Sequence, residues 1–108
     1  MADIDDLRKQ FSDVDANDLR KVLATVEGQR LLWGLLEDCR VYSHGFSTDP
    51  LLMAFESGKR SIGIGLIQRV MAIDPGLYDR ARMEAKREYS RRERLLTEQT
   101  LANREGVV

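Results

Sequence analysis

Apolar and polar positions along the chain recur with the period of an α-helix, and no stretch alternates as a half-buried strand does. Around residue 20, Leu19, Val22 and Leu23 share one face. Asn17 is a candidate N-cap for this helix, although Asp15 or Asp13 would also serve. A second helix is predicted from Thr25, its cap, with Glu27 in the first turn and a wide apolar stripe made of Leu31, Leu32, Leu35, Leu36 and Cys39.

Two Asp-Pro pairs predict where the later helices begin, because Asp caps a helix and Pro is preorganised for its first position. Asp49-Pro50 starts a helix that runs to Ile73. Asp74-Pro75 ends that helix and starts a fourth, which has no further proline and reaches about Leu101, roughly 40 Å away. The segment between the second and third helices is predicted to be an ordered loop anchored by the aromatic rings of Tyr42 and Phe46, with His44 between them.

These helices predict an all-α fold: a small helical domain of about four helices with a long charged C-terminal helix. Residues 1–14 are expected to form an acidic N-terminal segment, residues 15–83 the helical domain, and residues 84–108 a basic and mixed-charge helical extension. Since this extension has few apolar residues, we expect its part beyond about Tyr89 to project from the domain and to become ordered on a partner.

The stretch "FESGKRSIGIGLIQRV" contains Gly-Lys and Gly-x-Gly fragments that are also found in phosphate-binding loops. A P-loop needs Gly-x4-Gly-Lys-Ser/Thr, but here Arg60 follows Gly58-Lys59, and Met53 occupies the position of the first glycine. We therefore expect a packing role. The second half of this helix is apolar nearly all round, which predicts a central buried helix, and close approach of another helix is predicted on the face formed by Ala54, Gly58, Ser61 and Gly65.

Charge is unevenly distributed along this chain of 108 residues, whose formal net charge of −1 argues against a purely electrostatic DNA-binding protein. Residues 1–18 hold six acidic and two basic side chains, whereas residues 80–94 hold seven basic and three acidic ones. Such an asymmetry is typical of interaction surfaces, although many charge runs only keep a helix soluble. The candidate partner-binding residues share one face of the last helix and are Arg80, Arg87, Arg91 and Arg94.

Chemically reactive side chains are few. His44 is the single histidine and belongs to no nucleophile or metal motif, and Cys39, the single cysteine, is predicted to be buried and inert. We therefore expect no enzymatic activity, no cofactor and no metal. Glu84 and Glu88 are interpreted as part of a solvated mixed-charge helix. The acidic N-terminus does not look like a signal peptide, the lone cysteine favours a reducing compartment, and no segment has the apolar length of a membrane span.

Two segments together resemble a small domain encoded in the virion-assembly gene clusters of tailed, mostly short-tailed, bacteriophages. In the first, Glu27-Gly28 and Arg30 match an E-G-x-R pattern. In the second, Ala54-Phe55, Gly58, Arg60 and Gly63 match most of an A-F-x-E-G-x-R-x-x-G pattern, but Ser57 stands where the acid should precede the glycine. The resemblance covers the middle of the chain and neither end. It implies a virion-associated structural protein without enzymatic activity.

The resemblance and the charge pattern lead to two hypotheses. The first is a protein that is synthesised in the host cytoplasm, becomes part of the virion as a homo-oligomer or ring, and binds other virion proteins at the portal, the tail or the internal core and ejection apparatus. The arginines of the last helix would meet acidic surface there. The alternative is a nucleic-acid-associated packaging or regulatory accessory protein that uses the basic C-terminal helix. Binding that falls steeply with salt would favour the alternative, because phosphate contacts release counterions.

Overall fold

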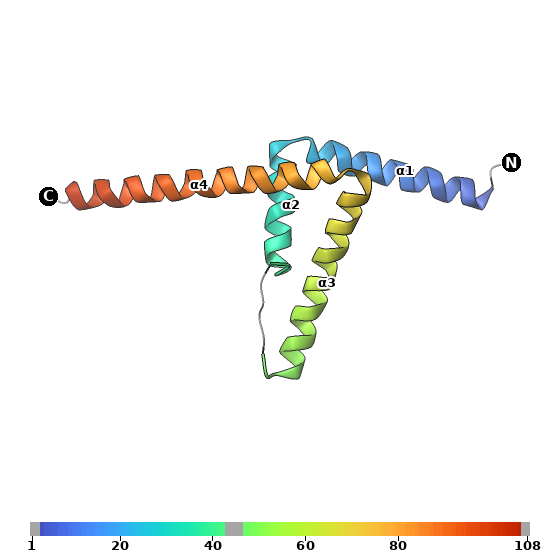
Figure 1. Ribbon diagram of the computed structural model, residues 1–108, viewed down its shortest axis with the longest axis horizontal. Helices are drawn as coiled ribbons and strands as arrows, with labels where there is room; N and C mark the ends of the chain where they lie inside the picture. Colours follow the sequence, from blue (N-terminus) through green and yellow to red (C-terminus); the bar gives the residue numbers. More distant parts are fainter. Residues whose placement is uncertain (1–2, 43–46, 107–108) are drawn as a thin grey trace.

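The computed structural model describes residues 3–42 and 47–106, and these form helices without any strand. The predicted all-α fold with a long charged C-terminal helix is confirmed. In chain order the elements, labelled in Figure 1, are α1 (Ile4–Leu23), α2 (Val26–Asp38), α3 (Pro50–Ile73) and α4 (Pro75–Glu105).

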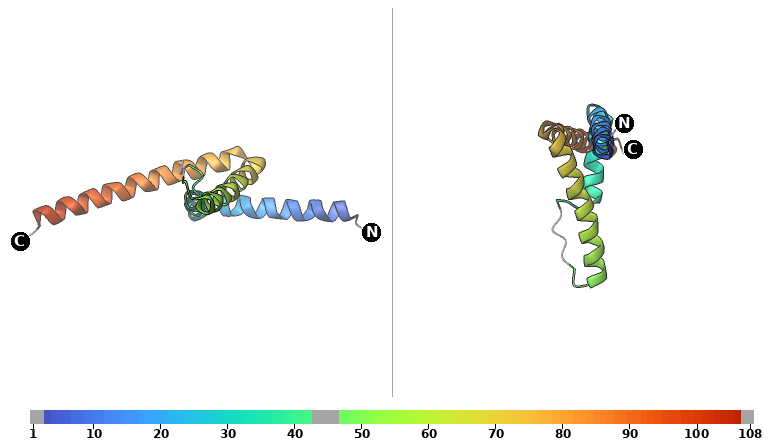
Figure 2. Two further views of the ribbon diagram at one scale, coloured as in Figure 1. Left: turned by 90° about the horizontal axis from the view of Figure 1, so that it is seen from below. Right: turned by 90° about the vertical axis from the view of Figure 1, so that its right-hand side faces the viewer.

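The molecule is elongated. Helices α1 and α4 follow its long axis and point their free ends in opposite directions, while α2 and α3 extend to one side of them (Figures 1 and 2). The principal extents are 78 × 39 × 20 Å and the radius of gyration is 19.7 Å, compared with about 13 Å for a compact domain of this size. A large share of the helical surface is therefore left open.

The core lies where the end of α1, the length of α2, the second half of α3 and the start of α4 meet. Its members are apolar side chains that are at least 95% buried: Leu23, Leu32, Leu36, Val70, Leu77 and Ala81. All of them fall between residues 23 and 81, so both ends of the chain are helix without core residues.

The predicted caps of α2, α3 and α4 are confirmed. The backbone N–H of Gly28 donates to Oγ1 of Thr25 over 2.9 Å, and Asp49 and Asp74 accept in the same way from the second residue of their helices. Because these bonds satisfy backbone donors that would otherwise have no partner, they fix where each helix begins.

The predicted start of the first helix, at Asn17, Asp15 or Asp13, is wrong. Helix α1 begins at Ile4 and runs without interruption to Leu23. Residues 4–23 contain no glycine or proline that would break the backbone, and the acidic first turn interacts favourably with the helix dipole. Asp3 precedes the helix but makes no side-chain cap hydrogen bond.

The predicted packing of the small-residue face of α3 is also wrong. A Cβ atom built on Gly58 or Gly65 would meet no atom within 4 Å, so no helix of the described chain approaches there. Nor is the second half of α3 buried on all sides, since only Gly63 and Val70 are buried in it, while Ile62 is 71% exposed. Apolarity on every side of α3 left the choice of covered face open, and the chain covers the face around Val70.

The glycine that allows close packing is Gly63, which lies against the C-terminal turn of α2. A Cβ atom on Gly63 would overlap Cγ2 of Val41 and would lie 2.8 Å from Cβ of Cys39. Cys39 is only half-buried, whereas the sequence predicted that it would be buried. The apolar stripe of α2 is narrower than predicted, because Leu31 and Leu35 are exposed.

Candidate functional site

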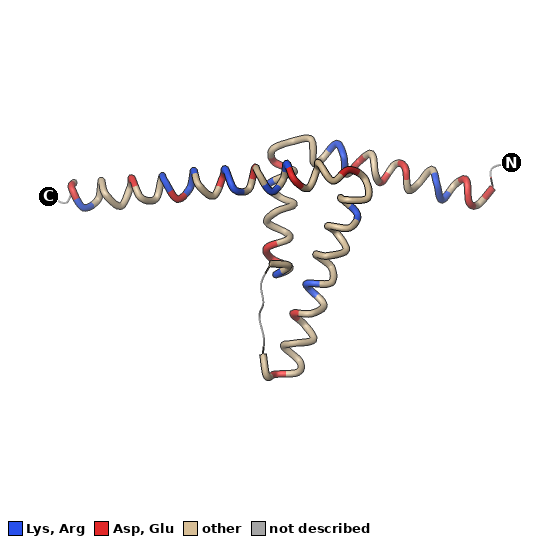
Figure 3. The backbone as a smooth tube through the Cα atoms, in the orientation of Figure 1, with Lys and Arg blue, Asp and Glu red and all other residues tan. Residues whose placement is uncertain are grey.

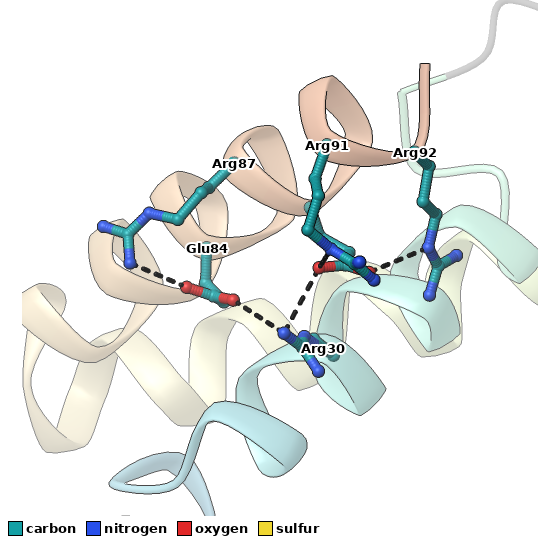
Figure 4. A network of polar contacts seen from close by, with 6 residues as sticks. Arg30, Glu84, Arg87, Arg91 and Arg92 are labelled. Carbon is teal, nitrogen blue, oxygen red and sulfur yellow. Dashed lines mark hydrogen bonds and ion pairs between the residues drawn. The ribbon is translucent and has the colours of Figure 1, made fainter. Parts of the chain in front are cut away.

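A cluster of charged side chains joins α2 to α4 beside the core. Arg30 of α2 reaches between two carboxylates of α4, with its Nη2 atom 3.4 Å from Glu84 and 3.2 Å from Glu88 (Figure 4). Glu84 and Glu88 continue the face that holds Leu77 and Ala81, which is why they are carried into the interface with α2. Their side chains are only 8–9% exposed, so the interpretation of this pair as solvated is wrong.

Three further arginines of α4 complete the cluster from the solvent side. Arg87 lies 3.3 Å from Glu84. Arg91 donates two hydrogen bonds to the Glu88 carboxylate, over 3.1 and 2.7 Å, and Arg92 donates a third over 3.0 Å. Four guanidinium groups therefore surround two carboxylates, and the cluster keeps an excess of positive charge.

The arginines also decide the ionisation of the cluster. The hydrogen bond from Arg91 is the largest influence on Glu88, and together with Arg92 and Arg30 it outweighs burial and lowers the pKa of Glu88 to about 2. In return, the hydrogen bond to Glu88 raises the pKa of Arg91. Glu88 and Arg91 therefore both stay charged at neutral pH.

The structure distributes the four candidate partner-binding arginines over α4. Arg87 and Arg91 belong to the cluster, whereas Arg80 lies 3.8 Å from Asp74 at the start of the helix and Arg94 lies 3.9 Å from Glu98 further along it. Each of the four side chains is more than half exposed, and Figure 3 shows the basic residues gathered on α4 while acidic ones prevail on α1. Their role in partner binding stays a prediction.

Sequence reasoning missed Arg30 and the inward position of both glutamates. The local signal was the spacing from Leu77 through Ala81 to Glu84 and Glu88, at steps of four, three and four, which extends an apolar face into charge. Two acids on a core-facing stripe require a cation from another element.

Three aromatic rings hold the C-terminal turn of α2 against the start of α4. Trp33 stacks on Tyr42 with ring centroids 5.2 Å apart, and its ring lies 5.7 Å from that of Tyr78. The hydroxyls of Tyr42 and Tyr78 are hydrogen-bonded to each other. Burial, followed by this hydrogen bond, raises the pKa of Tyr42. Tyr42 is thus an anchor as predicted, while His44 and Phe46 lie outside the described residues.

The turn that carries Tyr42 has the hydrogen bonds of a Schellman motif. Val41 N–H donates to the carbonyl of Leu36 over 3.3 Å, and Arg40 N–H donates to that of Glu37 over 2.9 Å. Arg40 takes the position usually filled by glycine, with φ of 54°. Its side chain lies 3.6 Å from the carboxylate of Glu56, so the turn is also attached to α3.

A cavity of about 170 Å³ lies beside the cluster, between α2 and α4. It is smaller than the pockets of about 300–1,000 Å³ that hold drug-sized ligands. Within residues 3–42 and 47–106, no group of three or more His, Cys, Asp or Glu side chains is placed to hold a metal ion. No helix in the same ranges has the length and apolarity of a membrane span. The chemistry of the site is that of charged and aromatic side chains on rigid helices.

Comparison with known families gave one match. The sequence model of a family described as "Bbp19-like phage protein" matches residues 19–86, which is more than half of the chain. The matched region begins near the end of α1 and includes Arg30, Glu84 and the whole core. No curated protein and no solved structure matches the chain.

Proposed function

Because the chain belongs to the family of Bbp19-like phage proteins, we propose that it is a virion-associated structural protein that binds other virion proteins. Its partners would be proteins of the portal, the tail or the internal core and ejection apparatus. The protein would be synthesised in the host cytoplasm and end up in the particle. The proposed role is binding without catalysis or cofactors, and it rests on the surfaces of the helices.

The observation that carries the proposal is the uncovered outer face of α3. Leu51, Phe55 and Ile62 are 83%, 63% and 71% exposed, and with Gly58 and Gly65 they follow the alternating four- and three-residue spacing of a helix–helix seam. Single exposed apolar residues are ordinary, but a row of them along a 24-residue helix is typical of a binding surface.

The two open glycines of this face, Gly58 and Gly65, support the same conclusion. Each glycine within a helix costs roughly 0.8–1.0 kcal/mol relative to alanine. In the described chain, nothing approaches Gly58 or Gly65 closely enough to require the absence of a side chain. A partner helix that packs closely against this face would supply the reason for both.

The alternative, a nucleic-acid accessory protein, would use the arginines of α4. Each of Arg80, Arg87, Arg91 and Arg94 already lies within 4.0 Å of a carboxylate of its own helix or its cap. The surface therefore carries both signs of charge, which a protein partner can match and the phosphates of DNA cannot, so this arrangement favours a protein partner. This alternative predicts that the association constant for duplex DNA falls steeply with salt, and that each arginine replaced makes the slope of log K against log salt shallower by about 0.9. That result would show that phosphate contacts carry the function instead.

The proposal is tested on purified particles by crosslinking and mass spectrometry. We expect the protein to be present, with crosslinks from the neighbourhood of α3, such as Lys59, to another virion protein. A phage whose gene carries Ile62→Ser should incorporate less of the protein, because the change removes a central apolar contact of the α3 face. Leu31→Ser is the matched control, since Leu31 is 61% exposed on α2 and lies outside that face. Absence of the protein from particles, or equal incorporation of both variants, would contradict the proposal.

A further inference from the structure

The outer part of α1 carries an apolar stripe that the described chain does not cover. Every residue from 3 to 15 is exposed. The stripe consists of side chains at steps of three, four and three, with exposed fractions of 65%, 38%, 62% and 57%: Ile4, Leu7, Phe11 and Val14. None of these four residues belongs to the core or packs against it. We call them the α1 stripe.

The α1 stripe is not an extension of the core face of its helix. At 100° per residue, its four positions lie between about 100° and 180° around α1 from Leu23, the residue that the core buries completely. Helix α1 therefore has two apolar faces on different sides. One face packs inside the molecule, and the other points into solvent over about three turns.

Charge identifies the kind of surface that would cover the stripe. Residues 3–18 hold six acidic and two basic side chains, and the one ion pair that joins two of them, Arg8 with Asp5, is long at 4.0 Å and exposed. Asp15 and Asp18 lie four residues beyond Phe11 and Val14 and thus on the same side of the helix. A partner must offer apolar side chains among basic ones.

The part of α4 from residue 80 to residue 96 is such a surface. Residues 80–94 hold seven basic and three acidic side chains, and two of those acids, Glu84 and Glu88, are turned inward onto Arg30. What faces solvent is therefore more basic than the sequence count indicates. Exposed apolar side chains follow directly, with Leu95 45% and Leu96 63% exposed.

The two surfaces of one molecule cannot meet each other. The free ends of α1 and α4 lie at opposite ends of the molecule, which is 78 Å long, and the core lies between these two ends (Figures 1 and 3). Contact is available only between copies.

From this placement we infer that the outer segment of α1 of one copy docks on residues 80–96 of α4 of a second copy. The inference rests on the proposed function and deepens it by naming a second copy of this chain as a partner. Each copy offers two such contacts. Two copies lying antiparallel side by side make both at once, and a head-to-tail arrangement continues into a ring.

Sedimentation velocity of the full-length protein over a concentration series tests the contact directly. We expect reversible self-association that weakens between about 50 and about 500 mM salt, because salt screens exposed charges. Phe11→Ser should lower the association constant by roughly tenfold or more, whereas Leu31→Ser, which removes an equally exposed apolar side chain from α2, should leave it unchanged.

A charge-swap experiment identifies the two surfaces. The variant Asp15→Lys/Asp18→Lys reverses two charges on α1, and the variant Arg87→Glu/Arg94→Glu reverses two on α4, so that residues 3–18 of the first variant and residues 80–94 of the second carry no net charge. Neither variant should associate alone, but an equimolar mixture should associate, because the unchanged basic α4 of the first fits the unchanged acidic α1 of the second. Circular dichroism melting of each variant verifies that it is folded, and Phe11→Ser tests the contact independently of any charge.

The inference is overturned if the wild-type protein is monomeric throughout, if Phe11→Ser associates like Leu31→Ser, or if the mixture of folded charge variants stays monomeric. A monomeric protein that purified particles nevertheless contain would refute only this inference. A self-associating protein that particles lack would refute only the virion role.

Discussion

Replacing Gly63 and Gly65 by alanine, one at a time, tests which face of α3 is closely packed. Gly63 lies in the close contact that the structure shows, and Gly65 lies where a close contact was predicted but is not formed. The two glycines are two residues apart in the same helix. At Gly65 the new methyl group would meet nothing within 4 Å, whereas at Gly63 it would lie 2.8 Å from Cβ of Cys39, an atom fixed to the backbone. The sequence environments are similar, and only the space around the methyl group differs.

The magnitudes follow from two terms. Alanine gains about 0.8–1.0 kcal/mol over glycine in a helix interior, at both positions. Overpacking typically costs about 1–3 kcal/mol, and it applies only at Gly63. The helix term cancels between the variants, so Gly65→Ala should be more stable than Gly63→Ala by about 1–3 kcal/mol, with Gly65→Ala above wild type. For a domain of this size, each kcal/mol shifts the Tm by about 4–8 °C.

Urea denaturation followed by circular dichroism measures both free energies of unfolding on the free protein. Shortening Val41 to alanine in the Gly63→Ala background should recover part of the loss, because Cγ2 of Val41 is the other atom that the methyl group would overlap. Equal stability of the two glycine variants, or a Gly65→Ala variant less stable than Gly63→Ala, would refute the contact between α3 and the turn after α2.

Three further predictions concern the charged cluster and the first turn of α2. Arg30→Ala should lower the Tm by several degrees, because it leaves two nearly buried carboxylates without their α2 partner, whereas Arg8→Ala, in an exposed pair, should change it little. Acidification should destabilise the protein as the pH falls from about 4.5 through about 2, because the contacts of Glu88 with the arginines stabilise the fold only while its carboxylate is charged. Glu88→Gln should flatten this part of a curve of Tm against pH. Gly28→Ala should be strongly destabilising in urea, because its methyl group would overlap the carbonyl oxygen of Val22, a backbone atom that cannot turn aside.

The starts of α2, α3 and α4 were predictable because each is written into neighbouring residues. Thr25, Asp49 and Asp74 cap the backbone two or three positions ahead, and proline follows both aspartates. The start of α1 was missed because Asp3 makes no such bond. Where the capping chemistry is local, sequence reasoning succeeds.

Packing faces were predicted less well, because they depend on residues far apart in the chain. Helix α3 offers apolar or small side chains on every side, and nothing in its own sequence says that the turn at Cys39 would select Gly63 over Gly65. The charged cluster has the same origin. In the sequence of α4, Glu84 and Glu88 look like solvated residues. Their burial is possible because Arg30 of α2 compensates for the lost hydration of both carboxylates.

The aromatic contact at the end of α2 gives the protein an internal optical probe. Trp33 is the single tryptophan of the chain, and it packs against both Tyr42 and Tyr78 where α2 meets α4. Its fluorescence therefore reports on that junction alone, while the far-ultraviolet dichroism is summed over every helix, including the outer segments of α1 and α4. Melting curves recorded with both signals coincide only if the outer segments unfold together with the core. A dichroism curve that begins to fall at lower temperature than the tryptophan signal would measure the fraying of the outer segments, and the addition of a binding partner would bring the two curves together.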